Sequence, residues 1–102
     1  MTRFIILILY INLTFTYGNT INVGSNHAIK SLTKAISIAK DGDTIFVHKG
    51  IYREGNIIIN KRLILIGKDY PTFDGEKKVE VFSIKHDSVI FKGFKVINGA
   101  YG

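Results

Sequence analysis

Residues 63–67 read Leu-Ile-Leu-Ile-Gly, and residues 89–93, which begin 26 positions later, read Val-Ile-Phe-Lys-Gly. A second pair of matching segments, Phe-Asp-Gly at 73–75 and Ile-Asn-Gly at 97–99, is 24 positions apart. Short apolar strands that end at turn residues and return with a period in the mid-twenties are typical of solenoids, in which each repeat is one coil stacked on the coil before it. The repeat therefore predicts an all-β solenoid.

The solenoid that fits this period is a right-handed, single-stranded parallel β-helix, whose first two to three coils would occupy residues 44–102. Because about three repeats are normally needed for stability, we expect the chain to be the N-terminal part of a longer protein, truncated at its C-terminal end. The alternative is a small antiparallel β-sandwich or meander, which the scarcity of hairpin dipeptides disfavours.

Alternation along each expected strand predicts which side chains point into the coils. The expected strands are 44–47, 57–59, 63–66, 81–84, 89–91 and 94–97, and the expected inward side chains are Ile45, Val47, Ile57, Ile59, Leu63, Leu65, Val89, Phe91, Phe94 and Val96. Ile58, Ile64 and Ile66 are then expected to point outward. They are either exposed residues without a function, residues covered by a loop, or a docking surface for a membrane or a periplasmic partner.

A helix is expected before the first of these strands, at about residues 26–40. Its apolar residues follow a 3.6-residue period: Ala28, Ile29, Leu32, Ala35, Ile36 and Ala39. Ser25 or Asn26 is expected to cap its start, and Gly42 to end it. Since a solenoid exposes the core of its first coil, we expect this helix, within an N-terminal segment of residues 19–43, to cap that coil.

Residues 1–18 have the pattern of a secretory signal peptide. Arg3 precedes an apolar run of about a dozen residues, and the segment ends in Thr16-Tyr17-Gly18, with small residues at its first and third places. A membrane anchor is the alternative, but spanning a bilayer takes roughly 20 apolar residues. We expect cleavage after Gly18, a product that begins at Asn19 and is periplasmic or secreted, and no stable membrane span after cleavage.

Composition excludes several classes of protein. A chain of 102 residues is too short for a multidomain enzyme, and the absence of cysteine excludes disulfide scaffolds, thiolate zinc sites and cysteine nucleophiles. The 14 Lys and Arg outnumber the 8 Asp and Glu, but no basic run after the leader exceeds two residues. Nucleic-acid-binding proteins cluster such charge on one face, so we expect solvated lysines and no nucleic-acid partner.

The acidic and imidazole side chains do not form a recognisable site in the sequence. Polysaccharide lyases and hydrolases need several carboxylates on one face. Here the aspartates fall at expected turns and the glutamates are isolated: Asp41, Asp43, Asp69, Asp74, Asp87, Glu54, Glu76 and Glu80. The imidazoles are His27, His48 and His86, of which His48 and His86 could meet if their coils stacked. We assign no catalytic, cofactor-binding or metal-binding residue, and we do not expect the protein to be an enzyme.

The order of motifs resembles the start of the NosD family, across about residues 21–99. The motifs are Ser31-Leu32 with Ala35-Ile36 and Ala39, then Asp41-Gly42-Asp43-Thr44-Ile45, then Gly50-Ile51-Tyr52, then Lys61-Arg62-Leu63-Ile64-Leu65-Ile66-Gly67, then Asp74-Gly75. Gly-Asp-Thr-Ile and Gly-x-Tyr are shared with many extracellular β-helix proteins, including pectin-degrading enzymes. What narrows the resemblance is their combination with the basic pair, the Leu-x-Leu-x-Gly strand and the Asp-Gly turn.

This resemblance implies a pectin-lyase-like β-helix that works in the periplasm as a non-enzymatic accessory protein. NosD-like proteins assist the assembly of the copper sites of nitrous oxide reductase together with an ABC-type transporter. Copper, transporter subunits and the reductase are therefore the implied cofactor and partners. Two alternatives remain: a carbohydrate-active or carbohydrate-binding β-helix protein of the lyase or hydrolase kind, and a structural surface solenoid.

Overall fold

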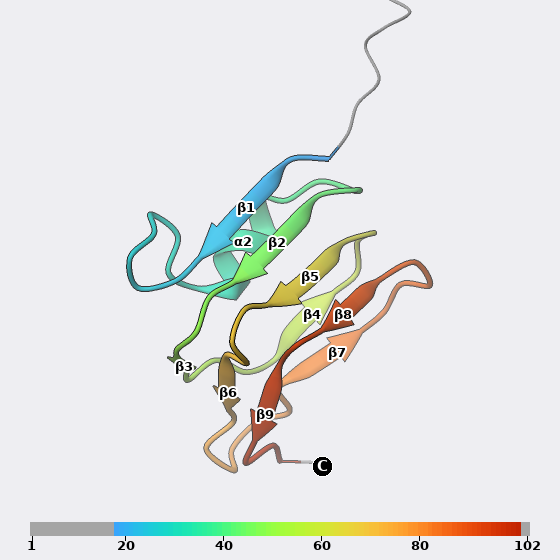
Figure 1. Ribbon diagram of the computed structural model, residues 1–102. Coiled ribbons are helices and arrows are strands. Elements are labelled where there is room, and N and C mark those ends of the chain that lie inside the picture. Colours follow the sequence, from blue (N-terminus) through green and yellow to red (C-terminus); the bar gives the residue numbers. More distant parts are fainter. Residues whose placement is uncertain (1–17, 101–102) are drawn as a thin grey trace, which may run out of the picture.

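The computed structural model describes residues 18–100, which wind into a parallel β-solenoid of about three coils with one short helix (Figure 1). The expected signal peptide lies outside the described residues except for Gly18. The elements are β1 (Thr20–Val23), α2 (Leu32–Ile38), β2 (Thr44–Val47), β3 (Ile51–Tyr52), β4 (Ile57–Ile59), β5 (Ile64–Gly67), β6 (Thr72–Asp74), β7 (Phe82–Ile84), β8 (Ile90–Lys92) and β9 (Lys95–Ile97).

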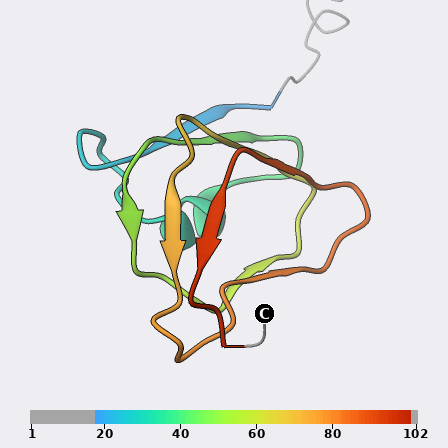
Figure 2. The ribbon, with the colours of Figure 1, turned by 60° about the horizontal axis from the view of Figure 1, so that its bottom comes forward.

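The strands stack into three parallel sheets, one for each side of the solenoid. Sheet A contains β1, β2, β5 and β8 in that order, sheet B contains β3, β6 and β9, and sheet C contains β4 and β7. Figure 2 looks more nearly along the stack and shows successive coils following the same path. In sheet A, Thr44 is in register with Ile64, and Ile64 with Ile90, so the step between coils is 20 residues and then 26. The prediction of a stacked parallel solenoid is confirmed.

Inward side chains form the core, as alternation along the strands predicts. Ile45, Val47, Ile57, Ile59, Leu63 and Leu65 are at most 1% exposed, and the later residues Val89, Phe91 and Phe94 pack partly buried against them. Val96 is 46% exposed, although its predicted inward position is confirmed by its register. Its register with Phe73 places it in the inward row of sheet B, but no coil of the described chain lies beyond it.

Three strands were not expected from the sequence: β1, β3 and β6. The signal for two of them is weak, because β3 is two residues long and β6 carries one apolar residue, Phe73. β1 matters most, since it precedes the helix and pairs with β2 from Thr20 to Val23. The solenoid therefore starts one strand earlier than predicted.

The helix is shorter than predicted, with seven residues in place of about fifteen. It begins after Ser31, whose Oγ accepts a 3.0 Å hydrogen bond from the Lys34 amide, so Ser25 and Asn26 are not its cap. Ile29 fits the helical period but forms a parallel bridge with Val23, which keeps this stretch extended. Gly42 has a φ of +93° and lies in the turn that follows the helix, not at its end.

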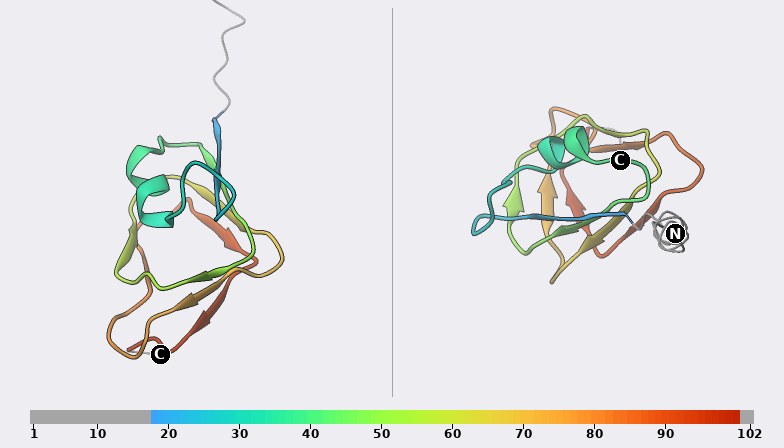
Figure 3. Two further views of the ribbon diagram at one scale, coloured as in Figure 1. Left: turned by 90° about the vertical axis from the view of Figure 1, so that its left-hand side faces the viewer. Right: turned by 90° about the horizontal axis from the view of Figure 1, so that it is seen from above.

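The expected role of the helix as a cap is confirmed. Along the chain, α2 lies between β1 and β2, and in the first coil it takes the place that strands of sheets B and C take in later coils. It packs against β1 and β4 (Figure 3). Leu32, Ala35 and Ile36 of α2 and its C-cap Ala39 are buried on the inner side of the helix. These side chains close the first coil in the way that inward strand residues close the later ones.

Candidate functional site

Four of the eight acidic side chains, those of Asp41, Asp43, Glu54 and Asp74, bind backbone amides. Asp41 Oδ1 accepts a 2.9 Å hydrogen bond from the amide of Arg62, in the following coil. Asp43, which is 4% exposed, accepts from the amides of Asn19 and Lys40, each at 2.8 Å. A carboxylate that holds two amides of the turns around it is fixed in the fold and is a poor candidate for acid or base catalysis.

Glu54 and Lys61 bind the two ends of α2. The Glu54 carboxylate accepts hydrogen bonds from the amides of Leu32 and Thr33, each at 3.0 Å, and from Thr33 Oγ1 at 2.9 Å. Lys61 Nζ donates to the carbonyls of Ile36 at 2.7 Å and Ala39 at 2.8 Å. The acid lies at the positive end of the helix and the base at the negative end, so both charges suit the helix dipole.

Asp74, the last residue of β6, has the same kind of role at the turn that follows this strand. Its Oδ1 accepts from the Glu76 amide at 2.8 Å and from Asn98 Nδ2 at 3.1 Å, in the next coil. These hydrogen bonds, the Glu76 amide first, lower the pKa of Asp74 below its ordinary value. The remaining carboxylates, Asp69, Glu76, Glu80 and Asp87, are exposed and come from three different turns. Glu76 Oε2 lies 3.8 Å from Arg53 Nε, a surface ion pair.

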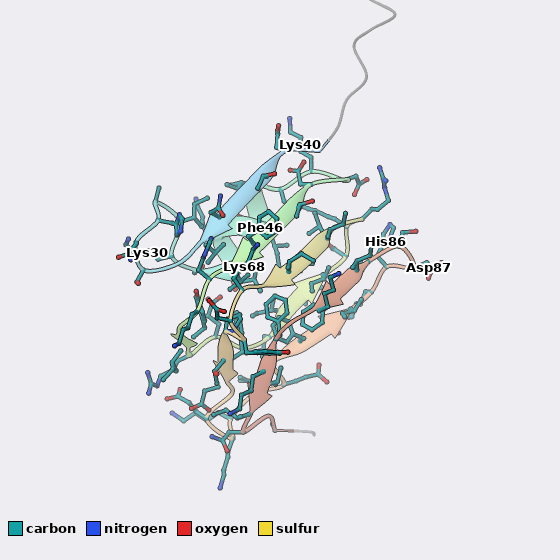
Figure 4. All side chains as sticks on the ribbon, viewed as in Figure 1. Lys30, Lys40, Phe46, Lys68, His86 and Asp87 are labelled. Carbon is teal, nitrogen blue, oxygen red and sulfur yellow. The ribbon has the colours of Figure 1, made fainter. Side chains whose placement is uncertain are left out.

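The structure brings together a different pair of histidines from the one that the sequence suggested. His48 stacks on His27, with the ring centroids 4.4 Å apart and an interplanar angle of 22°. His48 Nε2 also lies 2.8 Å from Asn22 Oδ1, while His86 lies in the turn after β7, where its Nδ1 accepts from the Ser88 amide (Figure 4). Burial, followed by the charges of His27 and Lys68, lowers the pKa of His48.

The histidine pair does not amount to a metal centre. Within residues 18–100, no three side chains of the kinds that ligate metals, His, Asp and Glu included, come together. A Cu²⁺ site needs several converging nitrogen or other ligands, and this pair offers two stacked rings. We therefore assign no metal ligand in the described chain.

The clearest surface feature is an apolar strip on the outer side of sheet A. Its members are outward residues of β2, β5 and β8 in adjacent register positions: Phe46, Ile64, Ile66 and Ile90. We call these four residues the outer apolar face. The first three are half-buried by their neighbours, and Ile90 is 51% exposed.

Basic side chains border the outer apolar face. Lys68 Nζ lies 4.6 Å from the centroid of the Phe46 ring, a cation–π contact that Figure 4 shows over β2. Lys92 is the register partner of Ile66 at the far side of sheet A. A hollow of about 480 Å³ adjoins this edge, and its lining includes Arg62, Ile64, Asp87 and Ile90. Apolar and basic groups thus lie side by side on one surface.

The sequence predicted half of this face. Ile64 and Ile66 were expected to point outward and do, but Phe46 and Ile90 were not singled out. Alternation with the inward neighbours Ile45 and Phe91 is the signal that could have found them. Ile58, also expected outward, is 48% exposed on sheet C and belongs to a different side of the solenoid.

In the part of the chain that the structure describes, no helix is long and apolar enough to cross a bilayer. Comparisons with protein families, with curated proteins and with solved structures find no match to this chain. The candidate site is therefore defined by its own geometry, an apolar strip with a basic border on the outside of sheet A.

Proposed function

We propose that this protein is an exported, non-catalytic β-solenoid that binds a protein partner through the outer apolar face. The observation that carries the proposal is the repetition of apolar residues outward in three successive strands of sheet A, at Phe46, Ile64, Ile66 and Ile90. Alternating strands of a solenoid normally present polar residues to solvent. A contiguous apolar strip with a charged border is the pattern of a protein-binding surface.

The arrangement of the acidic residues favours binding over catalysis. Asp43, Glu54 and Asp74 are each held by two or more hydrogen-bond donors of the fold. Glycan cleavage would need acidic groups that face a common substrate, as the acid and base of hydrolases do. A sugar would also require polar groups to match its hydroxyls, which the outer apolar face lacks.

The finer form of this proposal is a NosD-like role in the periplasm, in which the protein helps to assemble the copper sites of nitrous oxide reductase together with an ABC-type transporter. It is supported by the resemblance of the sequence motifs and by the pattern of a signal peptide. In this role copper is the cargo of the assembly pathway, and no residue of this chain is assigned to it. Transporter subunits or the reductase are the candidate partners for the outer apolar face.

The test is deletion of the gene in the organism that makes the protein, followed by complementation. We expect nitrous oxide reductase to be made but to lack its full copper content. Wild-type protein and the Ile58→Thr variant should restore the copper content, and the Phe46→Thr/Ile66→Thr variant should not. Threonine suits a strand, and Ile58 is a matched outward isoleucine on sheet C, so this comparison separates loss of the face from loss of the fold.

Two results would contradict the proposal. Full copper content in the deletion strain would exclude the NosD-like role. Depolymerisation of pectin or alginate by the purified protein, abolished by replacing an acidic residue, would favour the carbohydrate-active alternative over a binding function.

A further inference from the structure

The nitrogen of Asn19 lies against a buried carboxylate. It donates a 2.8 Å hydrogen bond to Asp43 Oδ1, while the Lys40 amide donates to Asp43 Oδ2, also at 2.8 Å. Asn19 is the first residue after the expected cleavage site and directly precedes β1. The carbonyl of Asn19 also accepts from the Thr44 amide at 2.9 Å, so both backbone groups of this residue bind the start of the next coil.

Asp43 is the one buried charged residue in the described chain, with 4% of its surface exposed. Aspartate is almost never buried to this extent without a partner of opposite charge. Here both contacts to its oxygens come from neutral amides, which satisfy its hydrogen bonds but leave its negative charge without a cation at the same distance.

We propose that cleavage after Gly18 turns the Asn19 nitrogen into the missing cation, so that the new N-terminus forms an ion pair with Asp43. The proposal rests on the signal-peptide hypothesis and is independent of the proposed binding function. A signal peptidase would hydrolyse the Gly18–Asn19 bond with one water. The new carboxylate leaves with Gly18, and the proton that it releases is taken up by the amine, giving an ammonium group on Asn19.

The geometry needs no rearrangement for this pairing. The nitrogen already stands at 2.8 Å from Oδ1, which is the usual separation of an ammonium and a carboxylate. An ammonium keeps hydrogens to donate, so the existing hydrogen bond is retained and gains charge. The site lies at a hollow of about 490 Å³, whose lining includes Lys40, Asp41 and Arg62 as the other charged groups that face it.

Gly18 supplies a second, independent observation. A Cβ placed at Gly18 would overlap the backbone carbonyl of Gly42, so residue 18 fits against this turn only as glycine. In the uncleaved chain a Gly18→Ala substitution would therefore disturb the contact with Gly42. In the cleaved chain residue 18 is absent, so the substitution should change neither the mass nor the stability of the product.

The first experiment is export of the wild-type protein and of Gly18→Ala in a bacterial host, with intact-mass measurement and urea unfolding of the products. Alanine is also a small residue, so the signal peptidase should accept it. We expect both products to begin at Asn19, with equal masses and equal unfolding midpoints. A product that begins at any other residue overturns the proposal.

The second experiment tests the ion pair itself. Cyanate near pH 6 blocks the α-amine selectively, because lysine amines are then almost fully protonated, and the blocked nitrogen keeps an N–H donor but loses its charge. We expect blocking to lower the folding equilibrium constant of the wild-type protein by about tenfold, the size of a charge-assisted bond over a neutral one. The same treatment of Asp43→Asn should change it by less than about twofold.

An equal effect of blocking on wild-type protein and Asp43→Asn would overturn the proposal, as would no effect on either. If Asp43→Asn does not fold, the effect of blocking on the wild-type protein alone decides, with Asp41→Asn as the control. Asp41 lines the same hollow, so its variant should keep the full effect of blocking. Peptide or partner binding through the outer apolar face is a separate measurement, and its failure leaves this result unchanged.

Discussion

Glu54→Ala should remove the support of the first turn of α2 and destabilise the whole protein. Three hydrogen bonds meet at this carboxylate, from the Leu32 amide, the Thr33 amide and Thr33 Oγ1. Loss of a helix N-cap costs about 0.5–2 kcal/mol, and hydrogen bonds to a charged group contribute about 1.5–3 kcal/mol each when partly buried. Because Glu54 is half-buried and Thr33 is exposed, we expect a loss of about 2 kcal/mol in the free energy of unfolding.

The effect spreads beyond the helix because α2 has only seven residues and cannot persist without its contacts. When its first turn loosens, Leu32, Ala35 and Ile36 are exposed, and they cover the core of the first coil. For a domain of this size, a loss of about 2 kcal/mol lowers the melting temperature by roughly 8–16 °C. Glu54→Gln keeps an acceptor oxygen but loses the charge, so it should fall between wild type and Glu54→Ala.

The assay is urea unfolding of the purified protein followed by circular dichroism, with Glu80→Ala as the matched control. Glu80 is an exposed glutamate in another turn, and its replacement should change the free energy of unfolding by less than about 0.5 kcal/mol. If Glu54→Ala proves as stable as Glu80→Ala, then the carboxylate does not hold the helix, and the argument that it is committed to the fold fails with it.

Three further changes test other parts of the structure. Leu32→Asp should cost several kcal/mol, since it places an unpaired charge in the core, while Lys34→Ala on the exposed side of α2 should be nearly neutral; similar melting temperatures would show that the helix is not packed there. Because the pKa of His48 is lowered from 6.5, the unfolded chain binds a proton more readily than the folded one, so stability should fall as the pH drops below 6.5. His27→Gln should weaken that pH dependence, and an unchanged urea midpoint between pH 7 and pH 5.5 in the wild-type protein would contradict it. Gly67→Ala should cost about 2 kcal/mol or more in urea unfolding, because its Cβ would overlap the backbone of the next coil; a loss below about 0.5 kcal/mol would show that this contact is not tight.

The strands that alternation and period predict best are those with an apolar residue at each inward position. β2 and β4 were predicted to the residue, because each is a short apolar run between turn residues, with Ile45 and Val47, or Ile57 and Ile59, at alternate positions. β1 was missed although Ile21 and Val23 alternate with the polar residues Thr20 and Asn22, because the repeat that identified the solenoid starts only after the helix.

The helix and the histidines show why the remaining details were not predictable. Ile29 fits a helical stripe and a strand bridge equally well in sequence, and only its contact with Val23 decides between them. His27 and His48 meet because the turn after β1 folds back over the end of β2, a geometry that no local pattern encodes. Contacts between loops depend on the stacking of whole coils, which a period measured in residues fixes only coarsely.

The charged side chains of this protein connect one coil to the next. The side-chain hydrogen bonds that join Asp43 to Asn19, Asp41 to Arg62, Glu54 to Leu32, Lys61 to Ile36 and Asp74 to Asn98 span 24, 21, 22, 25 and 24 residues, which is about one coil in each case. Hydrophobic ladders exclude a slip of one residue, which would turn every inward side chain outward, but a slip of two residues would keep these side chains inward. A carboxylate that must meet two particular amides permits a single register. We therefore expect these residues to fix the stacking of the coils. Phe46, Ile64, Ile66 and Ile90 of the outer apolar face take no part in these side-chain hydrogen bonds.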